Sequence, residues 1–187
     1  MIDIAVVVLA AGSSRRFGPT DKLEQKLDGQ PLAFHIADTL SQLDFRWRLA
    51  VCQSADGEVP EGLARRGFEI VINPDPDRGQ ASSLALGAKR AGALGAPALL
   101  VALADMPAVS AGHLRTLVEQ FSTDPQRIVA SAGGRYRGPP AIFPAALFET
   151  LMELTGDGGA RHLIRGGTFV EGDEAQFRDF DVPEDFA

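Results

Sequence analysis

The stretch that decides the fold is Val6-Val7-Val8-Leu9-Ala10-Ala11-Gly12-Ser13-Ser14-Arg15-Arg16-Phe17-Gly18, and Lys22 follows it closely. Its apolar part predicts a buried strand at about residues 4–9. The small and basic residues after the strand predict a loop that binds a nucleotide triphosphate, because a glycine-containing turn with free N–H groups forms an anion-binding nest. Arg16 and Lys22 are predicted catalytic residues, because they would supply positive charge against the triphosphate. The alternative is a flexible crossing loop with solvated arginines.

Two common nucleotide-binding motifs do not fit this loop. Gly12 and Gly18 are separated by five residues without a glycine, which excludes the dinucleotide fingerprint. No Gly-Lys-Ser/Thr follows, so the P-loop is excluded as well. NAD-dependent redox chemistry is therefore a weak hypothesis.

The composition is that of an ordinary soluble domain. The chain has 187 residues, of which 45% are hydrophobic and 23% charged, and we expect one domain over 1–187. A net charge of -7 argues against a nucleic-acid partner. No apolar run reaches the roughly 20 residues that span a bilayer, so we expect a cytoplasmic protein without a membrane partner. The single cysteine, Cys52, excludes an intramolecular disulfide and is expected in the core.

Strand and helix patterns alternate along the chain. Continuous apolar runs predict strands at about 4–9, 47–52, 68–72, 98–103, 128–131, 141–143 and 177–182. Helical periodicity predicts helices at about 31–43, 79–93, 110–121, 144–154 and 160–164, and Pro183 should open a short terminal helix. Residues 54–60 are predicted as a polar turn. The expected fold is α/β: a Rossmann-like three-layer α/β/α with a mostly parallel sheet.

Residues that could bind or react with a ligand follow the predicted strands. They are Gly12 to Lys22, Asn73 to Ser83, Asp105 and Asp181. Ligands of open α/β sheets bind beyond the carboxyl ends of the strands, so these segments should meet at one edge.

The opening loop also carries a family resemblance. Leu9-Ala10-Ala11-Gly12-x-Ser14-x-Arg16-Phe17-Gly18, followed by Lys22, resembles the signature loop of MobA-like nucleotidyltransferases, especially molybdenum cofactor cytidylyltransferases. The resemblance covers almost the whole chain and implies a fold of the nucleotide-diphospho-sugar transferase type. In the guanylyltransferase branch, the third residue of the corresponding Leu-Ala-x-Gly is usually Gly, so Ala11 favours CTP over GTP. The implied nucleotide-binding residues of the loop are Leu9, Ala10, Ala11, Gly12, Ser13, Ser14, Arg16 and Lys22.

Asp105 is the expected catalytic carboxylate. It lies in Leu103-Ala104-Asp105-Met106-Pro107, directly after a buried strand, where its side chain should enter the cleft. Nucleotidyl transfer needs Mg²⁺, which takes one or two carboxylates together with substrate oxygens and water. Asp105 is our first choice of ligand, and the resemblance implies the same. The alternatives are a helix N-cap and a surface turn.

Two further acids compete to assist Asp105. Asp181, in Phe180-Asp181-Val182-Pro183-Glu184-Asp185, resembles the first Asp of the family's terminal motif, which helps to hold the metal. Asp157 lies in Gly156-Asp157-Gly158-Gly159-Ala160-Arg161, which resembles the cytidylyltransferase Gly-Asp-x-Gly-Ala-Arg motif. Asp157 either aligns the pterin-side phosphate or positions Arg161, and helix capping is an open alternative for both acids.

The base and the acceptor have their own candidate segments. Gly79, Ser83 and Gly87 recur at four-residue intervals. The resemblance assigns base and ribose contacts to Gly79 and Ser83, the alternative being helix–sheet packing, which we expect for Gly87. Gly138-Pro139-Pro140 resembles an acceptor segment that often reads Gly-His-Pro in the cytidylyltransferases, and Pro139 departs from that pattern. Gly138, Pro140, Asp157 and Arg161 are the implied acceptor-binding residues.

The histidines are not expected to bind a metal. His35, His113 and His162 share no metal-ligand spacing, and each lies in a predicted helix or at its margin. Structural or solvated roles are predicted for all three.

The expected reaction is attack by the terminal phosphate of molybdopterin on the α-phosphorus of CTP, with Mg²⁺ as cofactor and pyrophosphate as the leaving group. A molybdoenzyme that receives the product is a further expected partner. The alternatives are a sugar or polyol phosphate as acceptor, GTP as the nucleotide, and a non-catalytic nucleotide-binding chaperone of a molybdoenzyme.

Overall fold

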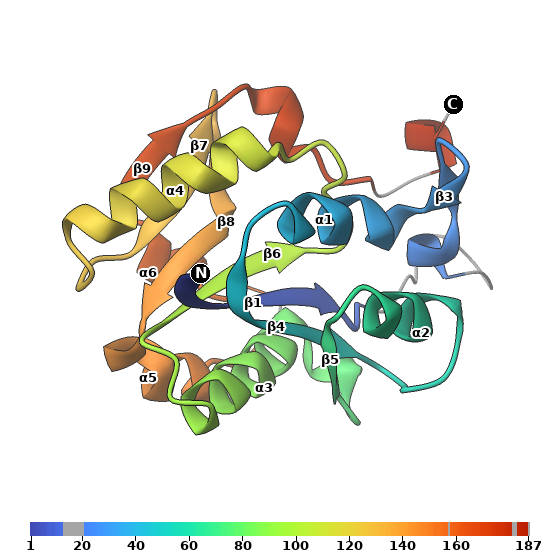
Figure 1. Ribbon diagram of the computed structural model, residues 1–187, viewed down its shortest axis with the longest axis horizontal. Coiled ribbons are helices and arrows are strands. Elements are labelled where there is room, and N and C mark those ends of the chain that lie inside the picture. Colours follow the sequence, from blue (N-terminus) through green and yellow to red (C-terminus); the bar gives the residue numbers. More distant parts are fainter. Residues whose placement is uncertain (13–20, 157, 181–182, 187) are drawn as a thin grey trace.

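A computed structural model describes residues 1–12, 21–156, 158–180 and 183–186. These residues form a seven-stranded sheet in the order β5-β4-β1-β6-β8-β7-β9 (Figure 1). The strands are β1 (Ile2–Ala10), β4 (Phe45–Cys52), β5 (Glu69–Ile72), β6 (Ala98–Leu103), β7 (Val129–Gly133), β8 (Tyr136–Pro144) and β9 (Thr168–Glu171). The first four in sheet order are parallel, as are β7 and β9, whereas β8 is antiparallel to β6 and β7. The predicted mostly parallel sheet is confirmed.

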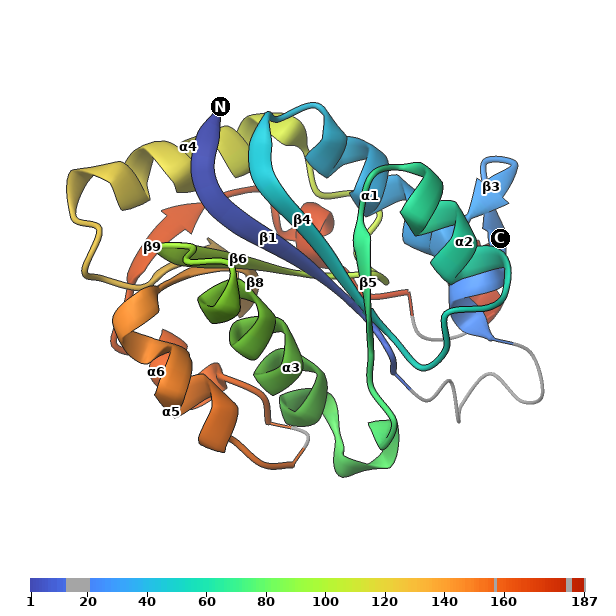
Figure 2. The ribbon, with the colours of Figure 1, turned by 60° about the horizontal axis from the view of Figure 1, so that its bottom comes forward.

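Helices cover both faces of the sheet (Figure 2). They are α1 (Leu32–Ser41), α2 (Glu58–Arg65), α3 (Gln80–Ala93), α4 (Ala111–Thr123), α5 (Phe148–Glu153) and α6 (Arg161–Ile164). Buried residues of α1, α2 and α4 pack in one apolar core, and those of α3, α5 and α6 pack in a second. The three-layer α/β/α prediction is therefore confirmed.

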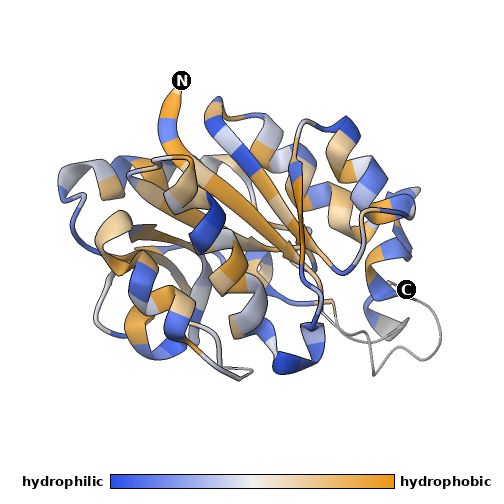
Figure 3. Ribbon diagram, turned by 90° about the horizontal axis from the view of Figure 1, so that it is seen from below, coloured by the Kyte–Doolittle hydropathy of each residue, from blue (hydrophilic) through white to orange (hydrophobic). Residues whose placement is uncertain are grey.

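Strand β1 supplies side chains to both cores. Val6 and Val8 belong to the first core, Ala5 and Val7 to the second, and all four are fully buried. This explains the unbroken apolar run, because successive side chains of a strand point to opposite faces. Figure 3 shows the apolar residues concentrated in the central strands.

Short elements connect this framework. They are β2 (Lys26–Leu27), β3 (Gln30–Pro31) and the 3₁₀ helices η1 (Lys22–Glu24), η2 (Pro76–Arg78), η3 (Ala145–Leu147), η4 (Glu174–Phe177) and η5 (Pro183–Phe186). The terminal helix expected at Pro183 is thus a 3₁₀ turn. No helix in the described part of the chain is long and apolar enough to cross a membrane.

Two predicted elements are wrong. The strand expected at 177–182 is absent from its described part, because Phe177 ends η4 and residues 178–180 form no ladder. The last strand is instead β9, an edge strand of the sheet that pairs in parallel with β7. The polar turn expected at 54–60 contains the start of α2, whose buried Val59 and Leu63 form a short apolar face.

Strand β8 is also longer than predicted. It covers Tyr136–Pro144 rather than 141–143, so the Gly138-Pro139-Pro140 segment belongs to the sheet. Prolines ordinarily argue against a strand, because they donate no ladder hydrogen bond.

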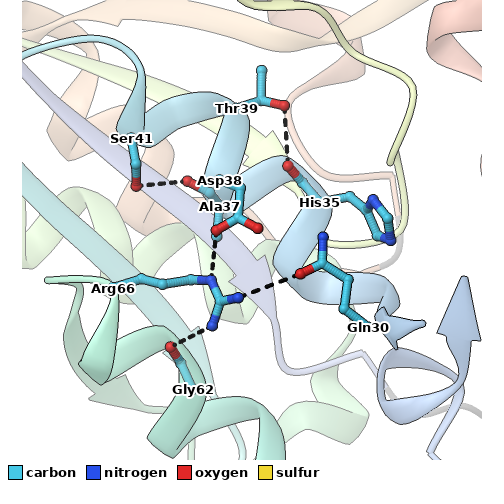
Figure 4. A network of polar contacts seen from close by, with 8 residues as sticks. All are labelled: Gln30, His35, Ala37, Asp38, Thr39, Ser41, Gly62 and Arg66. Carbon is cyan, nitrogen blue, oxygen red and sulfur yellow. Dashed lines mark hydrogen bonds and ion pairs between the residues drawn. The ribbon is translucent and has the colours of Figure 1, made fainter. Parts of the chain in front are cut away.

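Arg66 joins α2 to α1 (Figure 4). Its Nε donates to Asp38 Oδ1 at 2.6 Å, and its Nη2 donates to Gln30 Oε1 at 3.4 Å. The guanidinium also lies over the Phe34 ring, with Cζ 3.9 Å from the ring centroid. A Cβ at Gly62 would approach this ring to 2.0 Å, so only glycine fits at that position of α2.

We predict that Gly62→Ala lowers the free energy of unfolding by about 1–3 kcal/mol, because the ring and Arg66 must be displaced. Gly92→Ala in α3 is the matched control, since its Cβ would lie 3.5 Å from Phe148 Cδ2, an ordinary contact. The control should leave stability unchanged or raise it by up to about 1 kcal/mol through helix propensity. Urea denaturation measures both, and a Gly62→Ala protein as stable as the wild type would contradict the packing argument.

Candidate active site

The predicted phosphate loop starts at the carboxyl end of β1, between β4 and β6. Gln53, the residue after β4, donates from Nε2 to Ala11 O at 3.4 Å and to Gly12 O at 3.2 Å. On the other side, the Ala104 N–H donates to Leu9 O at 3.2 Å. Both neighbouring strands therefore hold the start of the loop. Ser13, Ser14 and Arg16 lie outside the described residues.

Gln53 is a site residue that the sequence analysis missed. Its position directly after a parallel strand was the available signal, because ligands of open α/β sheets bind beyond those strand ends.

Lys22 and Asp105 meet at this edge although 83 positions separate them. Lys22 Nζ donates to Asp105 Oδ2 at 2.7 Å, and the two side chains are 16% and 21% exposed. Opposite charge compensates the cost of removing each group from water. The fold thus brings together two of the three predicted catalytic residues, and the third, Arg16, is outside the described part of the chain.

Asp105 is not a helix cap. The N-cap of α4 is Ser110, whose Oγ accepts from the His113 N–H at 3.2 Å, as the sequence predicted. Asp105 instead occupies a turn after β6, with its carboxylate on Lys22. The capping alternative is therefore excluded.

The end of the chain returns to Asp105 even though the strand expected there is absent. The Phe180 N–H donates to Asp105 O at 3.0 Å, which places residue 180 beside the β6 turn. Arg178 and Asp185 form an ion pair, and the Phe180 and Phe186 rings lie 5.4 Å apart, so η5 packs against the same segment. Asp181 lies outside the described residues, and its role as a metal ligand stays a prediction.

A pocket extends from Asp105 across β8 to α6. Apolar and polar residues of β1, α3, β6, β8 and α6 and of the turns beside them line it: Leu9, Gln80, Leu84, Val101, Leu103, Asp105, Tyr136, Arg137, Gly138, Pro139, Phe143, Ala160, Arg161, Ile164 and Asp179. Gly138 and Arg161, two predicted acceptor residues, therefore share a pocket with Asp105. Pro140 does not line it, and Pro139 does.

Gly156 and Gly159 lie against the start of α3. The Ala81 N–H donates to Gly156 O at 3.2 Å, and a Cβ at Gly159 would lie 2.9 Å from Gln80 Oε1. This contact places the described residues of the predicted acceptor motif beside the start of α3, where Gly79 and Ser83 of the predicted base segment also lie. Asp157 lies outside the described residues, and the N-cap of α6, Ala160, makes no side-chain capping bond.

Gly79 and Ser83 do not line this pocket, although the residues that follow them in α3, Gln80 and Leu84, do. Gly79 is the N-cap of α3 at φ 85, a conformation that favours glycine. Ser83 is 4% exposed, and its Oγ accepts from Asn73 Nδ2 at 2.9 Å, as does Ser82 Oγ. The Ser83 hydroxyl is thus held inside the fold by Asn73, and its nucleotide contact stays a prediction. A Cβ at Gly87 would lie 3.1 Å from Val7 Cγ2, which agrees with the expected close packing.

The histidines and the cysteine have the predicted structural or solvated positions. His35 Nε2 lies 2.9 Å from Leu27 O, and His162 is exposed. His113 is buried with Nε2 2.8 Å from Ser131 Oγ, and burial lowers its pKa. Cys52 is buried in the core, where burial raises the pKa of its thiol to about 12. Within the described ranges, no group of three or more His, Cys, Asp or Glu side chains could hold a metal.

Comparison with known proteins identifies the family. The MobA-like NTP transferase domain matches residues 6–175. This chain belongs to the MobA-like NTP transferase family. The match includes the described start of the loop, Lys22 and Asp105, and ends before the terminal segment.

The family includes curated relatives of different roles. A molybdenum cofactor guanylyltransferase of Cereibacter sphaeroides is 34% identical over 187 residues, covering 97% of this chain and 92% of the relative. The purine catabolism protein PucB of Bacillus subtilis (strain 168) is 29% identical over 196 residues, covering 96% and 92%. The solved structure of a nucleotidyl transferase from Methanothermobacter has a similar fold, with a TM-score of 0.82, 25% identity and coverage of 98% of this chain and 94% of that chain.

The buried histidine leads to a pH prediction. Because burial lowers the pKa of His113, the unfolded chain takes up this proton more readily than the folded chain. We therefore expect the contribution of His113 to stability to be present above the unfolded pKa of about 6.5 and to be lost as the pH falls from there towards the folded pKa.

Urea denaturation between pH 8 and pH 5 measures this dependence. His113→Gln should lose less stability on acidification than the wild type, because it cannot take up the proton. His162→Gln, at an exposed position, should keep the wild-type dependence. Equal pH dependence of the wild type and His113→Gln would contradict the assignment.

Proposed function

We propose that this protein transfers the nucleotidyl group of a nucleoside triphosphate to the terminal phosphate of a molybdopterin, releasing pyrophosphate. The observation that carries the proposal is the contact between Lys22 Nζ and Asp105 Oδ2 at 2.7 Å, beside the start of the phosphate loop. The family match and the molybdenum cofactor guanylyltransferase relative support this choice of reaction and acceptor.

The chemistry requires no covalent enzyme intermediate. An acceptor phosphate oxygen attacks the α-phosphorus, the bond from that phosphorus to the β-phosphate oxygen breaks, and pyrophosphate leaves with the electron pair. The nucleophile is already ionised, so the protein mainly positions two polyanions and compensates their charge. Lys22 would supply positive charge to the triphosphate, and Arg161 would supply it to the acceptor phosphate at the far side of the pocket.

Asp105 suits Mg²⁺, because carboxylate oxygen is the ligand that this ion prefers. We propose Asp105 as the metal ligand, with Asp181 as the second. Bound there, Mg²⁺ would neutralise charge that develops on the triphosphate. Since the Lys22 ammonium lies on the Asp105 carboxylate in this structure, we expect Lys22 to turn towards the triphosphate when the nucleotide enters.

The proposed nucleotide is CTP. Ala11 stands where the guanylyltransferase branch usually has Gly, and the cytidylyltransferase branch has Ala. A specific observation favours GTP as the alternative, namely the 34% identical relative named as a guanylyltransferase. A sugar or polyol phosphate acceptor is the alternative on the other side of the reaction, because Pro139 departs from the Gly-His-Pro pattern.

A nucleotide panel tests the base assignment. Purified protein is given CTP, GTP, ATP or UTP with Mg²⁺ and molybdopterin, and pyrophosphate release is measured. We expect turnover to be fastest with CTP, and faster turnover with GTP would overturn the cytidylyl assignment. Absence of turnover with every nucleotide and with every phosphorylated acceptor offered would instead favour a non-catalytic chaperone of a molybdoenzyme.

Asp105→Asn tests the catalytic assignment. The amide keeps the shape of the side chain but loses the charge, so we expect kcat to fall by about 10²–10³-fold. Nucleotide binding, measured by calorimetry, should remain within a few-fold of the wild type.

Asp124→Asn is the matched control, because Asp124 is an exposed aspartate that pairs with Arg127 at 3.3 Å, away from the pocket. This control should keep wild-type turnover. Wild-type kcat in a folded Asp105→Asn protein would remove Asp105 from the mechanism.

A further inference from the structure

Gly138 and Pro139 of β8 line the pocket at a point where the pairing of β8 with β7 is interrupted. Pro139 and Pro140 have no N–H, so two consecutive residues donate nothing to the β-ladder. The pairing of β7 with β8 is also irregular here, since Ala130 pairs with Ala141 while the next residue, Ser131, pairs with Gly138. Pro139 and Pro140 are therefore skipped by the ladder.

We infer that Ser131 is a positioning residue for the acceptor, acting through the Pro140 carbonyl, and that Tyr136 supports the same pocket wall through the Pro139 carbonyl. The inference rests on the proposed function, in which the phosphorylated acceptor binds between Gly138, Arg161 and Asp105. Ser131 does not line the pocket itself.

The Ser131 side chain, from β7, makes a hydrogen bond to Pro140 where the ladder between β7 and β8 makes none. Its side chain is fully buried, and its Oγ donates to Pro140 O at 2.7 Å. A hydroxyl has one proton, so His113 Nε2, 2.8 Å from the same Oγ, must be the donor to Ser131. The chain His113 to Ser131 to Pro140 is thus directional and buried throughout, and such a chain holds its last acceptor firmly.

A second hydroxyl holds the neighbouring carbonyl. Tyr136 Oη donates to Pro139 O, and the Tyr136 ring stacks on Phe177 with centroids 5.1 Å apart. The His113 ring also packs against Phe177, edge to face, with the two ring centroids 4.9 Å apart. Two consecutive proline carbonyls therefore each accept a hydrogen bond from a side-chain hydroxyl. Phe177 packs against both Tyr136 and His113, the residue that donates to Ser131.

The position of the Gly138–Pro139 backbone determines the shape of the pocket. Gly138 and Pro139 line it together with Asp105 and Arg161. At Gly138 a Cβ would lie 2.6 Å from Tyr136 Oη, so the backbone and the tyrosine are in close contact. Nucleotidyl transfer depends on the alignment of the acceptor with the α-phosphorus, and small displacements of a binding wall cost rate steeply. Release of Pro140 O should therefore affect the acceptor more than the nucleotide.

The test compares Ser131→Ala and Tyr136→Phe with the wild type in pyrophosphate release. Each variant removes one hydroxyl and little volume. We expect KM for molybdopterin to rise about five- to tenfold in each variant, the loss of one hydrogen bond, while KM for the nucleotide stays within about twofold. Ser122→Ala is the matched control, because its Oγ makes an equivalent bond, to Val118 O at 2.8 Å, on an exposed part of α4.

Hydrogen–deuterium exchange gives a second readout that does not depend on activity. The amides of Gly138 and Ala141, which flank the two prolines, should exchange faster in Ser131→Ala than in the wild type, while those of β1 should not change.

The outcomes separate the inference from the proposed function. Unchanged acceptor KM in both folded variants, or an equal rise in the KM of acceptor and nucleotide, would overturn the positioning role. A wild type without turnover on any acceptor would overturn the proposed function, and unchanged exchange at Gly138 and Ala141 would then show that Ser131 does not hold the wall.

Discussion

The burial of β1 on both faces is the constraint on which the rest of this structure depends. Val6 and Val8 lie in one core and Ala5 and Val7 in the other, and all are fully buried. A strand of this kind is stable only with a neighbour on each side and helices on each face, since its backbone and its side chains both need partners away from water. Strands β4 and β6, with the two helical layers, meet that requirement.

The same arrangement creates the site. The chain goes from β1 to β4 on one side and later returns to β6 on the other, so the connections diverge at the carboxyl ends of β1 and β6. Open α/β sheets bind ligands in the crevice at such a switch point. Lys22, which follows the loop after β1, and Asp105, which follows β6, meet across it at 2.7 Å. The charged groups of Lys22 and Asp105 thus lie at the switch point, beyond the carboxyl ends of β1 and β6.

Sequence patterns predicted those parts of the fold whose stability depends on nearby residues. The range of β6, Ala98–Leu103, and the Ser110 cap of α4 follow from local apolar runs and capping chemistry. The β9 strand and the longer β8 could not be predicted in this way, because Thr168–Glu171 is short and partly exposed and β8 contains two prolines. Both become strands through pairing with β7, a partner distant from β9 in sequence.

For the site, the sequence by itself determined which residue types are available after which strands: the small and basic loop, Lys22, Asp105 and the Gly138-Pro139-Pro140 segment. Only the tertiary structure decided which of them meet. It paired Lys22 with Asp105, brought Phe180 to the Asp105 backbone, engaged Ser83 with Asn73 inside the fold, and added Gln53 and Ser131, which no motif had marked. The physical reason is that residue type is a local property of the chain. A hydrogen bond or an ion pair depends on the distance between atoms, which here is set by the packing of strands and helices far apart in sequence.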